Sequence, residues 1–143
     1  MRKHLEIGMY ANGFSVDNMS CTDITVAGAA GYFDYNIYFY YCLYNCISSN
    51  WGKTENQDWV SYQNSILGKL GLNLKPIIVR DNSLLFDLIK SQIDEQHPLL
   101  MLVKYYTLFY DEFYLRDDRI HASHGIIING YDSEKSLILT KEY

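Results

Sequence analysis

A cysteine and a histidine, far apart in the chain, are the two residues whose types and positions best suit catalysis. Cys21 follows Ser20, a typical N-cap residue, so we expect it in the first turn of a helix. The unpaired amides and the positive end of the helix dipole favour a thiolate there. His124 directly precedes a predicted strand, and imidazole titrates in the range that a general base needs. The pair predicts a thiol nucleophile, Cys21, with His124 as its base.

The same two residues also allow an interpretation without catalysis. A cysteine near a helix start is commonly a packed apolar side chain, and a histidine at a strand edge is commonly bonded to a backbone carbonyl. The chain order, with the cysteine early and the histidine about a hundred residues later, favours catalysis.

The other two cysteines are predicted to be structural. Cys42 and Cys46 would share one face of a helix, as half of a metal site would, but no second pair of ligands follows at a suitable spacing. We therefore expect core thiols, and we expect neither a metal ion nor another cofactor. Three cysteines are an odd number, which fits a reducing compartment better than a disulfide scaffold.

Length and composition predict one domain over residues 1–143. Hydrophobic residues make up 48% of the chain and charged residues 20%, which is typical of a globular protein. The net charge of −5, without a basic cluster, argues against nucleic-acid binding. Residues 1–9 lack the apolar core of a signal peptide, and no run reaches the roughly 18 apolar residues of a membrane span. We expect a cytoplasmic protein that binds neither nucleic acid nor membranes.

The first half of the chain is predicted to be helical. A helix that starts at Ser20 should run through residues 27–31, whose small side chains allow another element to approach closely. Residues 32–47 are rich in tyrosine and suit amphipathic packing. A stacking platform for nucleic-acid bases is the alternative for this segment, but basic residues are lacking there.

The second half adds two helices and a set of strands. One helix is predicted to be capped by Asn56 and ended by Gly71, and the next to be capped by Asn82 or Ser83. The predicted strands are residues 74–79, 99–103, 125–130 and 136–140, with a turn at residues 131–135. Helices come first and strands last, so the predicted fold class is α+β.

Three segments of the second half carry a resemblance to known enzymes. In residues 89–103 a helix leads through a histidine and a proline into an apolar strand; residues 113–115 follow; and in residues 121–132 His124 precedes Gly130-Tyr131-Asp132. These segments resemble papain-like domains related to the N-terminal family of the butirosin biosynthesis protein H and to the bacteriocin-processing C39 peptidases. The first half adds Cys21 at the head of a helix.

The resemblance implies a papain-like fold, in which N-terminal helices, with the nucleophile at a helix start, pack on a C-terminal antiparallel sheet. It also implies an acyl-thioester on Cys21, with His124 as general base and then general acid. In the butirosin-like branch, the acyl group comes from the phosphopantetheine of an acyl or peptidyl carrier protein and leaves as an amide with a small amine. That branch implies acyl transfer or amide synthesis in antibiotic biosynthesis of the nonribosomal-peptide type.

Two other functions are compatible with the same resemblance. In the peptidase branch the acyl donor is a peptide and the acceptor is water. An inactive papain-like domain that only binds a carrier protein or a peptide is the remaining alternative.

Papain-like enzymes orient the histidine with an Asp or Asn on the next strand. In this chain that place falls near Thr140, so the carboxylate is missing or shifted. Asp132 is excluded, because eight residues of strand separate it from His124 by about 26 Å. If the turn centres near residue 134, residues 140 and 142 share the face of His124. Thr140 or Glu142 is therefore predicted to hold the imidazole.

The resemblance also bears on the oxyanion site and on the C-terminus. The bacteriocin-processing peptidases place a glutamine before the cysteine to bind the oxyanion, and here Ser15 and Asn18 occupy that neighbourhood. Either side chain, with the backbone amide of Cys21, is a candidate donor. The family pattern continues beyond Tyr143, which predicts a truncated domain or a divided gene product.

Overall fold

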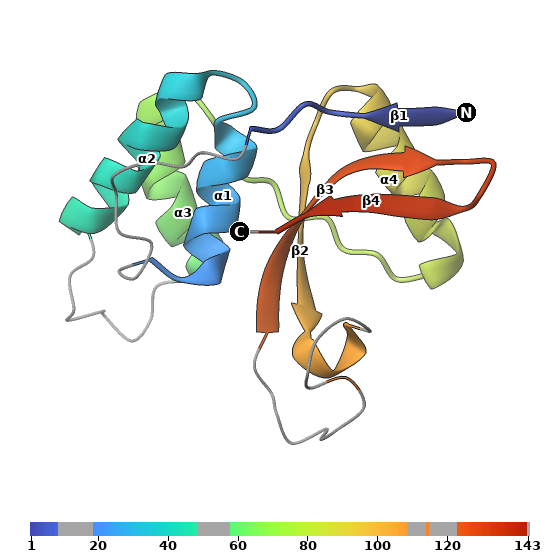
Figure 1. Cartoon of the computed structure of the whole chain (residues 1–143). Coiled ribbons are helices and arrows are strands. Elements are labelled where there is room, and N and C mark those ends of the chain that lie inside the picture. Colours follow the sequence, from blue (N-terminus) through green and yellow to red (C-terminus); the bar gives the residue numbers. More distant parts are fainter. Residues whose placement is uncertain (9–18, 49–57, 109–113, 115–122, 143) are drawn as a thin grey trace.

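The computed structural model describes residues 1–8, 19–48, 58–108, 114 and 123–142. These residues form an α+β structure, so the predicted class is confirmed (Figure 1). The elements are β1 (Arg2–His4), α1 (Cys21–Ala30), α2 (Tyr35–Ser48), α3 (Trp59–Leu67), α4 (Leu85–Asp94), β2 (Leu99–Lys104), β3 (Ser123–Asp132) and β4 (Leu137–Lys141), with 3-10 turns at Gly68–Leu70, Asn82–Leu84 and Tyr105–Thr107. None of the described helices is long and apolar enough to cross a membrane.

The first helix begins where the sequence predicts it. The side chain of Ser20 accepts a hydrogen bond from the backbone amide of Asp23 at 3.1 Å, which caps α1 and leaves Cys21 as its first residue. Every residue from Ile24 to Ala30 is buried. Small side chains make up much of this stretch, and they let α1 lie between the other two helices of the first half and the sheet (Figure 1).

The helices α1, α2 and α3 share one hydrophobic core. Its fully buried members include Ala27 of α1, Tyr41 and Cys42 of α2, and Ile66 of α3. The tyrosine-rich segment is thus a packed helix, as predicted. Cys42 is a core thiol, but the prediction for Cys46 is wrong, because this residue lies on the exposed face of α2.

The sheet is antiparallel and is organised around β3. This strand pairs with β2 from Ser123 to Ile128 and with β1 from Gly130 to Asp132. Its pairing with β4 contains a register shift between Ile128 and Gly130, where β3 has one extra residue. Because all three strands pair with β3, this strand carries the contacts that hold the sheet together.

A second core lies between the sheet and α4. Ile89 and Ile93 of α4 pack with Ile127 and Tyr131 of β3, and all four are almost completely buried. Figure 1 shows α4 on the other side of the strands from α1, α2 and α3, so β3 runs between α4 and the other three α-helices. Its run of buried side chains from His124 to Tyr131 follows from this position.

The strand predicted at residues 74–79 is wrong. This segment has no strand structure, and the backbone of Leu74 is bonded instead to the side chain of Asn64, at 2.6 Å for the Leu74 amide and 3.0 Å for its carbonyl. Pro76 supplies no amide for a ladder. An apolar run was therefore mistaken for a strand, whereas the three-residue strand β1 was too short to be predicted.

The predicted caps of the later helices also need correction. Asp58 caps α3, since its carboxylate accepts from the amide of Ser61, whereas Asn56 lies outside the described residues. Asp81 caps the 3-10 turn that leads into α4, in place of Asn82 or Ser83. Asp and Asn are about equally good caps, so spacing alone could not decide between neighbours.

Candidate active site

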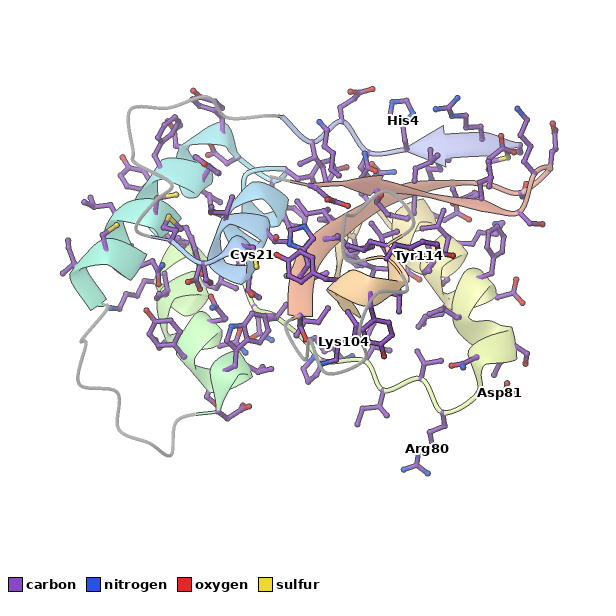
Figure 2. The ribbon with its side chains drawn as sticks, turned by 60° about the horizontal axis from the view of Figure 1, so that its bottom comes forward. His4, Cys21, Arg80, Asp81, Lys104 and Tyr114 are labelled. Atoms are coloured by element: carbon purple, nitrogen blue, oxygen red, sulfur yellow. The ribbon has the colours of Figure 1, made fainter. Side chains whose placement is uncertain are left out.

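The thiol of Cys21 lies beside the first residues of β3. Its Sγ is 4.0 Å from the backbone oxygen of Ser123 and 3.9 Å from the hydroxyl of Thr22, and the residue is partly buried. Figure 2 shows Cys21 at the junction of the helices and the sheet, on the same side of the molecule as Lys104 at the end of β2. The start of α1 therefore lies next to Ser123, the residue that directly precedes His124.

This close approach depends on Gly125. A Cβ at this position would lie 3.2 Å from Thr22 Cα and 3.0 Å from the hydroxyl of Thr25. The Thr25 hydroxyl also lies 2.6 Å from the carbonyl oxygen of Cys21 and 3.1 Å from that of Gly125. One hydroxyl therefore links the first turn of α1 to β3, and any larger residue at Gly125 would push the two apart.

A buried polar chain holds the first turn of α1 from the other side. The amide of Gln63, a fully buried residue of α3, donates to Asp23 Oδ1 at 2.9 Å and accepts a hydrogen bond from the hydroxyl of Tyr41. Burial raises the pKa of Tyr41, so this hydroxyl remains a donor at neutral pH. The second carboxylate oxygen of Asp23 accepts from Ser20 at 2.7 Å. These bonds restrict the position of the helix start that carries Cys21.

His124 is buried and bonded at both ring nitrogens. Its Nε2 lies 3.3 Å from Oε2 of Glu142, and its Nδ1 lies 3.2 Å from the hydroxyl of Tyr105. The rings of Tyr105 and His124 are 5.1 Å apart between centroids. Desolvation raises the pKa of Glu142. The imidazole therefore has a carboxylate on one side and a phenol on the other.

Among the described residues, no hydrogen bond joins Cys21 Sγ to the His124 ring. The nitrogen opposite Glu142 is the one that would have to accept the thiol proton, and it faces the Tyr105 hydroxyl. A working thiol–imidazole pair therefore requires the Tyr105 bond to open.

The candidate orienting residues are placed differently from each other. Glu142, one of the two residues predicted to hold the imidazole, contacts it. Thr140 is exposed and pairs with Ile128, four residues from His124 along β3, so the structure does not bring it to the ring. Asp132 accepts from the amides of Glu134 and Lys135 in the hairpin turn, as expected of a turn residue. Ser15 and Asn18, the candidate oxyanion donors, lie outside the described residues.

Sequence reasoning missed Tyr105. The chain has 14 tyrosines, and nothing in its immediate neighbours distinguishes this one. A usable signal was the pairing of the two predicted strands, because Val103 pairs with His124 and Tyr105 follows directly after β2. The described residues contain no group of three or more His, Cys, Asp or Glu side chains that could hold a metal ion.

Comparisons of the chain with protein-family models, with curated proteins and with solved structures found no match.

Proposed function

We propose that the chain is a papain-like cysteine acyltransferase that forms an amide from a carrier-protein thioester in natural-product biosynthesis. The single observation that supports this most strongly is the combination at the helix–strand junction. A capped helix start carries Cys21 4.0 Å from the backbone of the strand that bears His124, and that histidine is paired with Glu142 at 3.3 Å. Thiol, imidazole and carboxylate are the groups that nucleophilic acyl transfer requires.

The first half-reaction would load the acyl group on the enzyme. His124 takes the proton of the Cys21 thiol, and the thiolate attacks the carbonyl carbon of the thioester. A new carbon–sulfur bond forms to Cys21, the bond to the phosphopantetheine sulfur breaks, and the departing thiolate takes the proton from the imidazolium. Glu142 would stabilise the imidazolium and fix its orientation.

The second half-reaction would release the acyl group as an amide. A small amine attacks the acyl-thioester, and His124 takes the proton that the amine loses. The bond to the Cys21 sulfur breaks, and the imidazolium returns its proton to that sulfur. No oxidant or reductant is consumed in either half.

Intact mass of the protein after incubation with a hexanoyl-loaded carrier protein tests this proposal. We expect an added acyl group that is absent in Cys21→Ala and present in Cys46→Ala, the matched control, because Cys46 is an exposed thiol of α2. Addition of a primary amine should release the group as its amide. Release as the free acid, even with amine present, would indicate a hydrolase of the peptidase type instead.

A second function, binding without catalysis, is favoured by one observation. The Tyr105 hydroxyl occupies the imidazole nitrogen that a base would use. If the carrier protein binds but no acyl group is transferred to Cys21, this function replaces the enzymatic one.

A further inference from the structure

A groove of about 760 Å³ runs alongside α1. One wall is the face of α1 that carries Thr22, Val26, Ala29 and Ala30, and the opposite wall is β2 from Leu99 to Leu102. Residues 71–77, which include the first part of the strand expected at residues 74–79, form another wall together with α3. The volume lies within the usual range for sites that hold small organic ligands.

The groove adjoins the candidate active site, although neither Cys21 nor His124 lines it. Thr22, Thr25 and Gly125 line it, and these are the residues that bring the Cys21 turn against β3. Leu102, which pairs with Gly125, lines the same end. From Thr22 to Ala30 the wall formed by α1 is about 12 Å long, at about 1.5 Å per residue. An acyl group on Cys21 would have to pass Thr22, the next residue of α1, to enter the groove and extend along the helix.

The walls are mainly aliphatic. Val26, Leu67, Leu72, Leu74, Leu100 and Met101 line the groove, and Ala29 and Ala30 provide the space by being small. The backbone of a peptide carries a donor and an acceptor at every residue, and the aliphatic part of the walls leaves such groups without partners. Besides Thr22 and Thr25, the polar side chains that line the groove are confined to residues 73–75 and 92–97. An unbranched hydrocarbon chain makes no such demand and gains from leaving water.

We propose that this groove binds an unbranched aliphatic acyl chain, the acyl part of the thioester that Cys21 attacks. The inference rests on the proposed function, because the acyl carbonyl must meet the thiol. It names the substrate class of the reaction: a medium-chain fatty acyl thioester rather than an aminoacyl or peptidyl one.

The rate of Cys21 acylation by N-acetylcysteamine thioesters of acetate, hexanoate and decanoate tests the proposal. Each methylene group that moves completely from water into the groove in the transition state should accelerate acylation about three- to fourfold. We therefore expect the kcat/KM of the decanoyl thioester to exceed that of the acetyl thioester by at least about tenfold. Equal rates for all three thioesters would overturn the groove inference and leave acyl transfer intact.

Two neighbouring isoleucines provide a matched pair of variants. Ile77 lines the groove and is 43% exposed, whereas Ile78 does not line it and is 83% exposed. Ile77→Asp should lower the decanoyl-to-acetyl ratio about tenfold or more, and Ile78→Asp should leave both rates unchanged. If the two variants behave alike, the chain does not bind in this groove.

A binding measurement separates the groove from the chemistry. Trp59 lines the groove, and Trp51→Phe leaves it as the only tryptophan. In Cys21→Ala on this background, decanamide should change the Trp59 fluorescence with saturation, and Ile77→Asp should weaken the effect. Binding of decanamide without acylation of Cys21 in the otherwise unchanged chain would refute the proposed function alone. Absence of decanamide binding would refute the groove inference alone.

Discussion

The imidazole of His124 accepts or donates hydrogen bonds at both nitrogens, and this arrangement determines what the site can do at the scale of single residues. If Nε2–H donates to Glu142, Nδ1 is left as an acceptor, and the Tyr105 hydroxyl is placed to donate to it. The same tautomer is the one that a base for Cys21 needs. Glu142, which only accepts hydrogen bonds when it is ionised, therefore selects this tautomer, and the Tyr105 hydroxyl would compete with the thiol for the Nδ1 lone pair.

Removing this hydroxyl should speed the reaction of the thiol. In Tyr105→Phe we expect iodoacetamide to alkylate Cys21 about two- to tenfold faster, the equivalent of one hydrogen bond. Peptide mass spectrometry of timed samples gives the rate, and Tyr106→Phe is the control because it removes a neighbouring hydroxyl. An unchanged or slower rate would show that Tyr105 does not restrain His124.

The three thiols should differ in how they react with pH. Burial raises the pKa of Cys42 to about 11, so this thiol remains protonated through neutral pH and labels slowly. At pH 7 Cys21 should label faster than both Cys42 and the exposed Cys46, and in urea all three should label alike. If Cys21 is not faster than Cys46 in the folded protein, its helix position does not activate it.

At the scale of elements, the sequence predicted the face shared with His124 although one assumption was inaccurate. The turn occupies residues 133–136, so its centre lies between residues 134 and 135 and not at residue 134. Without any bulge, a turn with this centre would place odd-numbered residues of β4 on the face of His124. The register shift between Ile128 and Gly130 restores the pairing of Ile128 with Thr140, and so places even-numbered residues there. Period-two alternation means that either the odd-numbered or the even-numbered residues of β4 share the face of His124, and the bulge places the even-numbered ones there.

The contact between α1 and β3 is the element-level feature most open to test. Gly125→Ala should lower the free energy of unfolding by about 1–3 kcal/mol, because the added Cβ meets the backbone of α1 at Thr22. Gly68→Ala is the control, since nothing lies within 4 Å of a Cβ there. Chemical denaturation gives both values, and equal stabilities of the two variants would contradict the close packing at Gly125.

At the scale of the whole molecule, a charged cluster ties the N-terminus to the second core. Asp94 at the end of α4 bonds to Lys90 at 2.6 Å, to Tyr131 of β3 at 2.8 Å and to Lys3 of β1 at 3.2 Å. The hydrogen bonds from Lys90 and Tyr131 lower the pKa of Asp94 from 3.8 to about 2. One carboxylate thus connects a helix, the central strand and the first strand.

The pH dependence of stability should report this cluster. Because the folded pKa is lower than the unfolded one, the stabilisation is present above about pH 3.8 and is lost as the pH falls towards 2. Asp94→Asn should lower the melting temperature at pH 7, and the difference from the unchanged protein should shrink below pH 3.8. Asp87→Asn, on the exposed face of the same helix, is the control. A constant difference across this range would exclude the carboxylate as the cause.

The sequence by itself determined the local features: the capped start of α1 at Cys21, the packed tyrosine-rich helix, and the hairpin formed by β3, which carries His124, and β4. Each depends on hydrogen bonds or side-chain alternation within a few residues, which the order of residues specifies directly. Only the tertiary structure decided which groups surround His124. Tyr105, Glu142 and the groove beside α1 come together from segments up to about a hundred residues apart, and such packing depends on the shapes of all the elements at once.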